Sequence, residues 1–565
     1  MNKRILALAL VLIMLLALLA GCGSAAAEPT KAPEQTKAPE QTKAPEKEED
    51  PEPITDEPTG YTYPLPGETK TISIWTPSQP DVVSLMETFA NHKGVKYAEE
   101  AINVELEWFE VANNAAKEQY FTMVAGGEYP DIIREVASKY SDMGDSAVDE
   151  EIIINVAEML PEKMPDYWKL IQESTARDTI IKKMTTANGR IACIFSLVDE
   201  WIGPDPAYGP EIRADWLEKL NLQKPETYDE LHDVLTAFKT ELNCSDPILM
   251  PCTCLPMTSY MARGYDVPGI SASEWPTAPN PFFVVDGKIH YSLLEDGYKD
   301  YITMLHQWYE EGLINEDFYS RPRSWKDAVN TGLILTDQAG VIFNDMTAIG
   351  DLNGQATTEG FRLEGINDPV MTKGQTTHLG GKFTGVGGGN LSISTQCEDL
   401  DTVFAFLNWW YTEEGILTTN YGIEGETYTM VDGKPQYTEA ITVGDGDMTF
   451  AQRRAMNLFG NCGNYSITKR FDFIYSDIEI DARDRWMAHD DGAYYIMASM
   501  NGDESNEYST VYADVLTYIQ ERLLRFVIGE LNIETEWDDM VNGANEMGLS
   551  RCIELWQQAQ DRYAA

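Results

Sequence analysis

The segment TISIW, residues 71–75, alternates apolar and polar side chains as a half-buried strand does, and the apolar residues of 83–90 return at helical spacing. Alternation resumes in NVELEW at 103–108, and a helix is expected over 115–124 before YPDII at 129–133 enters a third strand. Strands that alternate with helices pair in parallel, because each helix carries the chain back to the starting end of the sheet. These segments therefore predict an α/β fold whose sheet is covered by helices on both faces.

The carboxyl ends of these strands are the expected place for a ligand, since open α/β sheets bind their ligands beyond those ends. Trp75 and Asp131 are expected at two such ends. Asn344 and Asp345 follow the apolar segment GVIF at 340–343 and are expected at the end of another strand. The sequence thus predicts that residues far apart in the chain contribute to one site.

The amino-terminal residues have the order of a secretory signal. Lys3 and Arg4 precede an apolar run over 5–20, and LAGC closes it at 19–22. The run is shorter than the ~20 apolar residues that span a bilayer, so residues 1–21 are interpreted as a removed signal peptide. LAGC resembles the lipobox of bacterial lipoproteins. This resemblance implies that Cys22 carries a lipid that anchors the protein to the extracytoplasmic face of the cell membrane.

Residues 22–60 form a segment of different composition, rich in Ala, Pro, Glu, Lys and Thr. Within it, TKAPEQ at 30–35 is repeated at 36–41. Such a segment has too little apolar surface to offset its ordering entropy, and its prolines keep it extended. It is predicted to be a disordered stalk between the lipid and the folded part.

The formal net charge of -50, from 92 acidic and 42 basic residues, argues against a nucleic-acid partner, because that role needs clustered Lys and Arg. Of the 8 cysteines, Cys22 is assigned to the lipid, which leaves an odd number in the mature chain. Cys252 and Cys254, with Cys244 nearby, lack the two-residue spacing and the flanking His of common zinc sites. We therefore expect neither a metal nor another cofactor.

Seven further segments, in this order along the chain, carry a resemblance to a known family. They are MVAGGEYPD at 123–131, NGRI at 188–191, RADWLEKLNL at 213–222, PETYDE at 225–230, WYEEGLI at 308–314, AFLNWWYTEEG at 405–415 and NYGIEG at 420–425. Together with LAGC they resemble the family 1 extracellular solute-binding proteins of ABC importers. Each segment alone is a weak signal, but their common order over nearly the whole mature chain is a strong one.

The resemblance implies a periplasmic-binding-protein-like fold, in which two α/β lobes are joined by a hinge that the chain crosses several times, with the ligand in the cleft between them. Crossings are expected near 191–200, 387–394 and 440–450. Lobe 1 is expected to hold residues 67–195 and 390–445, and lobe 2 residues 200–386 and 446–565.

The same resemblance implies a monomeric protein that captures a small solute outside the cell, delivers it to the permease subunits of an ABC transporter and catalyses nothing. An aromatic content of 10% and the large size favour an oligosaccharide, with a peptide or a polyol as alternatives. Two other classes stay open from the residues alone. One is an exported glycoside hydrolase that uses two carboxylates, and the other is a lipoprotein that acts as a sensor or adhesin.

A sugar presents apolar ring faces and rims of hydroxyl groups, so its site needs aromatic platforms beside carboxylates, amides and Arg. The aromatic candidates are Trp75, Trp201, Tyr208, Tyr260, Trp275 and Trp486. The polar candidates are Asp131, Glu200, Arg263, Asn344, Asp345 and Arg485. Trp75 is the leading candidate, because its strand is expected to end where the cleft opens.

Overall fold

The computed structural model describes residues 60–78, 84–140, 142–199, 208–250, 260–268, 281–321, 328–379, 384–444, 448, 450–460, 462–467, 475–488 and 490–564. Residues 59–565 form one compact unit, in which two sheets each have an apolar core of their own. The two halves are called lobe 1 and lobe 2 below. The predicted signal peptide, Cys22 and residues 22–59 of the predicted stalk lie outside the described residues, as do Glu200, Trp201 and Trp275.

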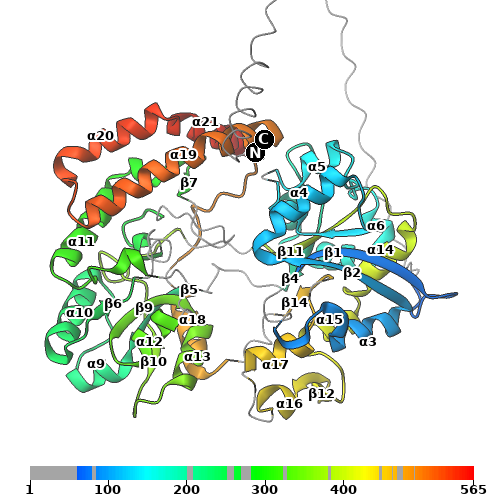
Figure 1. The fold of residues 1–565 in the computed structure, drawn as a ribbon, viewed down its shortest axis with the longest axis horizontal. Coiled ribbons are helices and arrows are strands. Elements are labelled where there is room, and N and C mark those ends of the chain that lie inside the picture. The colour runs from blue at the N-terminus through cyan, green and yellow to red at the C-terminus, as the bar shows by residue number, and fades with distance from the viewer. Residues whose placement is uncertain are drawn as a thin grey trace, which may run out of the picture. The chain divides into compact units, whose positions relative to one another are not determined.

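Lobe 1 is built on a six-stranded sheet in the order β14-β4-β11-β3-β1-β2 (Figure 1). Its strands are β1 (Lys70–Ser78), β2 (Val104–Ala112), β3 (Ile132–Arg134), β4 (Ile194–Val198), β11 (Val386–Ile393) and β14 (Tyr465–Ser466). β11 is antiparallel to both of its neighbours, and the other neighbouring pairs are parallel. The predicted α/β class is confirmed, with one antiparallel strand in the sheet.

The helices of lobe 1 precede and follow these strands. They are α3 (Lys93–Ile102), α4 (Ala116–Gly126), α5 (Asp145–Asp149), α6 (Leu160–Lys163), α7 (Pro165–Glu173), α8 (Arg177–Met184), α14 (Leu400–Trp409), α15 (Glu413–Tyr421), α16 (Glu439–Thr442) and α17 (Phe450–Asn457), with a hairpin of β12 (Tyr428–Val431) and β13 (Lys434–Tyr437). The helix expected over 115–124 is α4. The helix expected over 83–90 is interrupted, because Thr88 has extended backbone angles and its side chain caps a separate 3-10 turn, η1 (Phe89–Asn91).

The start of α3 depends on a buried histidine. The Nδ1 atom of His92 accepts a hydrogen bond from the amide of Gly94 at 3.0 Å, and its Nε2 atom lies 3.0 Å from the carbonyl oxygen of Ala455. These partners fit a neutral ring that carries its proton on Nε2. Burial lowers the pKa of His92 to about 4, which keeps the ring neutral near pH 7.

Lobe 2 is built on a four-stranded sheet in the order β10-β5-β9-β6. Its strands are β5 (Tyr208–Arg213), β6 (Asp246–Ile248), β9 (Ala339–Asp345) and β10 (Leu363–Gly365), and a hairpin of β7 (Phe282–Val285) and β8 (Lys288–Tyr291) lies apart. β5 is antiparallel to β10 and β9, whereas β6 is parallel to β9. The strands β6, β9 and β10 therefore end at the same edge, where β5 begins.

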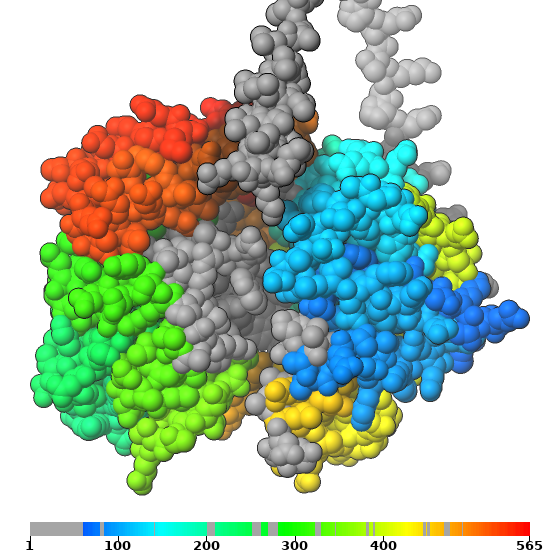
Figure 2. Space-filling view, in the orientation of Figure 1, coloured from blue at the N-terminus to red at the C-terminus, as the bar shows by residue number. Residues whose placement is uncertain are grey.

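The helices of lobe 2 are α9 (Ala214–Leu220), α10 (Tyr228–Leu242), α11 (Asp296–Glu310), α12 (Ala328–Leu335), α13 (Thr347–Gln355), α18 (Asp477–Ala488), α19 (Gly502–Val527), α20 (Ile533–Glu546) and α21 (Leu549–Ala564). Thr227 caps α10 through its side chain, which accepts a hydrogen bond from the amide of Glu230. The carboxyl-terminal helices, orange to red in Figure 2, pack on the green segment that contains α11. Within the described chain, no helix combines the length and the apolar composition that a membrane crossing requires.

The chain passes between the lobes at the end of the first expected range, just before the second and after the third. The range 191–200 contains β4 of lobe 1, so the first crossing follows Val198. The range 387–394 is β11 itself, and the second crossing lies before Val386. Residues 440–450 precede β14, which pairs with β4, so the third crossing follows Ser466.

The expected lobe boundaries change for the same reason. Phe459 and Cys462 belong to the apolar core of lobe 1, and β14 belongs to its sheet, so residues 446–466 are not part of lobe 2. β14 has only two residues, and a strand this short has no periodicity that a sequence could reveal.

Candidate functional site

In lobe 1, all three crossings occur at one edge of the sheet. β1, β3, β4 and β14 run in one direction and end at this edge, and the antiparallel β11 begins there. The three strands next to the crossings, β14, β4 and β11, are also adjacent in the sheet. We call this the crossing edge of lobe 1. It is the carboxyl-end edge at which open α/β sheets bind ligands.

Lobe 2 has a corresponding crossing edge. Tyr208, the first residue of β5 after a crossing, pairs with Asp345, the last residue of β9. Gly209 pairs with Asn344 in the same register. The predicted position of Asn344 and Asp345 at the end of a strand is therefore confirmed, and the register brings Tyr208 beside them.

A charged group that the sequence analysis did not select lies at the end of β3 in lobe 1, where Arg134 is level with Ile194, the first residue of β4. Arg134 is the last residue of β3 and is 5% exposed. One of its terminal nitrogens donates to the hydroxyl of Thr76 at 3.0 Å, and the other lies 3.6 Å from the carboxylate of Glu135. Burial lowers the pKa of Arg134, and the Glu135 carboxylate opposes this effect. In the sequence, the sign of this polar group is the pair of charged residues that directly follows the apolar residues of β3.

Glu135 itself has a backbone conformation that is uncommon for a residue with a side chain. Its φ angle is 61°, in the left-handed region, and its amide donates to the carbonyl of Asn390 at 2.9 Å. Such a conformation costs on the order of 1 kcal/mol and is found preferentially at binding sites. The Glu135 carboxylate also lies 3.8 Å from the ammonium group of Lys139, whose pKa burial lowers. Arg134, Glu135 and Lys139 thus form one compact polar group that follows β3, on the side of the sheet toward the crossing edge.

The prediction that Trp75 ends its strand is wrong. β1 continues for three residues to Ser78, and Trp75 pairs in register with Phe109 and Ile133. The indole is 4% exposed and makes an edge contact with Tyr120 at 5.9 Å between ring centres. β1 stays paired with β2 beyond Trp75, through Pro77 and Ser78.

Asp131 lies at the opposite end of its strand from the one expected, because β3 begins at Ile132. Its carboxylate accepts hydrogen bonds from the amide of Ser73 at 2.9 Å and from the Ser73 hydroxyl at 2.6 Å. These bonds connect the start of β3 to the middle of β1. Asp131 therefore stabilises the sheet at its amino edge.

Three further candidates contact the segment 366–368, which follows β10 at the crossing edge of lobe 2. The indole N–H of Trp486 donates to the carbonyl of Ile366 at 2.9 Å, and its ring is 2% exposed. Arg485 lies 3.5 Å from the side-chain oxygen of Asn367 and pairs with Asp481. These two residues come from α18 and support this segment from lobe 2.

Arg263, the third of these candidates, is 2% exposed and lies 3.2 Å from the Asp368 carboxylate. Burial raises the pKa of Asp368 to about 6, although the Arg263 charge opposes this shift. Because both partners of this ion pair are buried, Arg263 offers almost no surface to a ligand. Tyr260 begins the same short turn, η4 (Tyr260–Arg263), and its side chain lies outside the described residues, like those of Tyr208 and Asp345.

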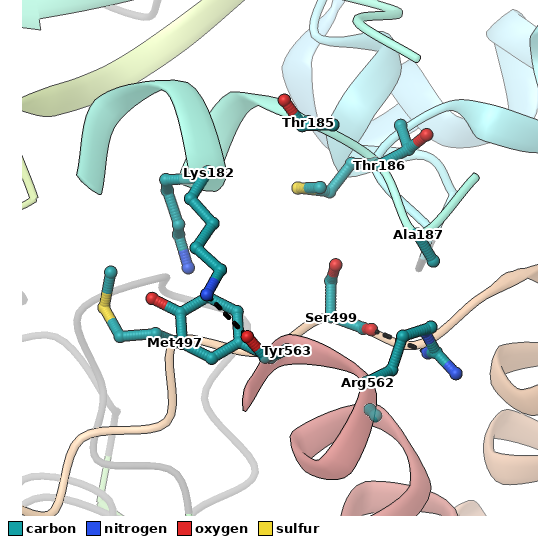
Figure 3. Close-up of a pocket in the computed structure, with 11 residues that line it drawn as sticks. Lys182, Thr185, Thr186, Ala187, Met497, Ser499, Arg562 and Tyr563 are labelled. Atoms are coloured by element: carbon teal, nitrogen blue, oxygen red, sulfur yellow. Dashed lines mark hydrogen bonds between the residues drawn. The ribbon is translucent and has the colours of Figure 1, made fainter. Parts of the chain in front are cut away.

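A separate pocket of about 150 Å³ lies between the end of α8 and the carboxyl-terminal part of the chain (Figure 3). Its lining residues are Met143, Lys182, Lys183, Thr185, Thr186, Ala187, Met497, Ser499, Ala559, Arg562 and Tyr563. Figure 3 shows Lys182, Thr185 and Thr186 opposite Met497, Ser499 and Tyr563. The lining therefore combines positive charge, hydroxyl groups and apolar surface.

Comparisons with known proteins agree on the fold. No family model matches the chain. The fructooligosaccharide ABC transporter substrate-binding protein FusA of Streptococcus pneumoniae is 22% identical over 540 residues, which cover 90% of this chain and 93% of FusA. Lipoprotein LipO of Bacillus subtilis is 29% identical over 231 residues, which cover 39% of this chain and 44% of LipO.

Among solved structures, the alginate-binding protein AlgQ2 superposes with a TM-score of 0.67 at 21% identity, covering 87% of this chain and 98% of AlgQ2. An HMO-binding, ABC-transporter-associated solute-binding protein of Bifidobacterium longum infantis superposes with a TM-score of 0.69 at 21% identity, covering 88% of this chain and 99% of that protein. This chain has the solute-binding-protein fold. The predicted two-lobed α/β fold is confirmed by these structural neighbours.

FusA, AlgQ2 and a further relative, YtcQ of Bacillus subtilis, are named for transport or binding and not for catalysis. Of the described side chains, no three His, Cys, Asp or Glu residues are arranged to hold a metal ion. Cys244 is buried with its sulfur 3.1 Å from the carbonyl of Gln338, and Cys252 and Cys254 lie outside the described residues. Burial also raises the pKa values of Cys193 and Cys462 to about 12, so these thiols are poor nucleophiles.

Proposed function

We propose that this protein is the extracytoplasmic, lipid-anchored solute-binding component of an ABC importer, and that its solute is an oligosaccharide. The observation that carries the proposal is the match to FusA along 90% of the chain, since FusA is named for the binding of fructooligosaccharides in ABC transport. YtcQ of Bacillus subtilis, named for binding polygalacturonan and rhamnogalacturonan, supports a carbohydrate at 23% identity over 344 residues. The permease subunits would be its partners, and the lipid on Cys22 its attachment to the membrane.

The proposed binding site comprises the two crossing edges. Lobe 1 contributes Arg134, Glu135 and Lys139, whose donors and carboxylate suit the hydroxyl groups of a sugar. In lobe 2 the strand register places the backbone position of Tyr208 next to those of Asn344 and Asp345, and residues of these types suit the ring face and the hydroxyl rim of a sugar. Ligand binding at both edges would favour closure of the lobes by rotation about the crossings.

The test is a thermal-shift screen of the purified mature protein against neutral and acidic oligosaccharides, short peptides and polyols. A ligand that binds only the folded state raises the melting temperature. We expect oligosaccharides, and neither peptides nor polyols, to do so, with calorimetry confirming one site. A shift with peptides alone would refute the sugar assignment.

The non-catalytic part of the proposal needs its own measurement. The binding oligosaccharide is incubated with the protein for a day and analysed by mass spectrometry. An unchanged oligosaccharide is expected, and shorter fragments would indicate a glycoside hydrolase.

A further inference from the structure

The pocket of Figure 3 has an unusual charge for this chain. Its 11 lining residues include Lys182, Lys183 and Arg562 but no Asp or Glu. The whole chain, in contrast, has 92 acidic and 42 basic residues. Because the protein as a whole is strongly negative, the positively charged lining of this pocket is not the result of an overall positive surface.

Two of the three cations have no acidic partner in the described part of the chain. The ammonium group of Lys182 donates to the carbonyl of Tyr563 at 2.5 Å and lies 3.8 Å from the centre of the Tyr563 ring. The ammonium group of Lys183 lies 5.7 Å from the centre of the Tyr495 ring. Carbonyl and aromatic partners stabilise a cation but do not neutralise it.

The third cation is neutralised by a neighbour. Arg562 makes two hydrogen bonds to the Glu504 carboxylate, at 2.8 and 2.6 Å, and a third to the carbonyl of Ser499 at 3.1 Å. This fixes the guanidinium group at the wall of the pocket. The charge available to a ligand is therefore that of Lys182 and Lys183.

The remaining lining indicates which anion would fit. The Tyr563 ring, Met143 and Met497 offer apolar surface, and the Ser499 hydroxyl offers a hydrogen-bonding group. Both lysines belong to the last turn of α8, whose partial negative charge disfavours anions and disfavours a doubly charged one most. A single carboxylate on an otherwise hydroxylated, partly apolar group suits this environment better than a phosphate.

We infer that this pocket, which is separate from the crossing edges, binds the carboxylate of an acidic sugar unit, so that the oligosaccharides this protein binds include ones with uronate residues. The inference rests on the proposed function and adds the charge of the ligand. Lys182 and Lys183 bind the carboxylate, and the apolar side chains of Met143 and Met497 contact the sugar. The unit held here bridges α8 of lobe 1 and the carboxyl-terminal part of lobe 2.

The test compares trigalacturonate with its fully methyl-esterified form, which has the same sugar rings without the negative charge. Affinities are measured by calorimetry for the wild-type mature protein, for Lys183→Met and for the double variant Lys182→Met/Lys183→Met. Lys169→Met on neighbouring α7 is the control, because this exposed lysine lies 3.9 Å from Glu173 and away from the pocket lining. Melting temperatures without ligand identify any variant that folds poorly.

We expect the wild type to bind trigalacturonate at least about tenfold more tightly than the ester, as hydrogen bonds to charged groups imply. The double variant should lose this preference, Lys183→Met should lose part of it, and Lys169→Met should keep it. The preference should also decrease between 50 and 500 mM salt.

Equal wild-type affinity for the acid and the ester would overturn the inference, as would a preference that survives in the double variant. If only the neutral oligosaccharides of the thermal-shift screen bind, the inference is overturned but the proposed function stands. Failure to bind any sugar of the panel would overturn both.

Discussion

Replacing Trp75 distinguishes a core residue from a ligand platform. Trp75 and Phe109 are partners in the β1–β2 register, yet the indole is 4% exposed and the Phe109 ring 47% exposed. Truncation of a buried Trp to Ala costs about 3–5 kcal/mol, because the transfer free energy and the cavity both count. Loss of the edge contact with Tyr120 contributes about 0.5–1.5 kcal/mol to such a change.

We therefore expect Trp75→Ala to lower the free energy of unfolding by about 3–5 kcal/mol, measured from urea denaturation followed by circular dichroism. Trp75→Phe should lose less, and Phe109→Ala, the matched control, should stay within about 0.5 kcal/mol of the wild type. Affinity of the folded Trp75→Ala protein for its sugar should change less than about threefold. Unchanged stability with binding weakened thirtyfold or more would refute the burial argument and return Trp75 to the site.

Three other predictions test separate features. The folded-state pKa of His92, about 4, lies below its unfolded value of 6.5, so the folded state binds fewer protons between these pH values. The free energy of unfolding should therefore fall by about 2–4 kcal/mol as the pH drops from 6.5 to 4. Urea midpoints measured across this range should fall less for His92→Gln than for the wild type. Gly209→Ala should cost about 1–3 kcal/mol, because the added methyl group would overlap the Trp486 ring, whereas Gly126→Ala meets no atom within 4 Å and should be near neutral in the same assay. Cys22→Ala should abolish lipid labelling and release the protein from the membrane fraction; unchanged labelling would exclude Cys22 as the anchor.

The α/β class of this protein is determined by local sequence. The alternation in residues 71–75 and 103–108 appears as β1 and β2, and the helical spacing over 115–124 appears as α4. These predictions are confirmed because each one depends only on which side chains of a single element face the core. The end of β9 at Asn344 and Asp345 was predictable for the same reason, since an apolar run stops there.

Tertiary pairing alone decided where each crossing lies and which end of each strand faces the site. The length of β1 is set by its parallel partner β2, so Trp75 became a core residue, and the late start of β3 moved Asp131 to the other edge. The two residues of β14 joined the lobe 1 sheet only because β4 lies beside them. A sequence shows periodicity within an element, but the partner across a sheet can be hundreds of residues away, and it is that partner that decides which side chains meet at the crossing edges and in the pocket beside α8.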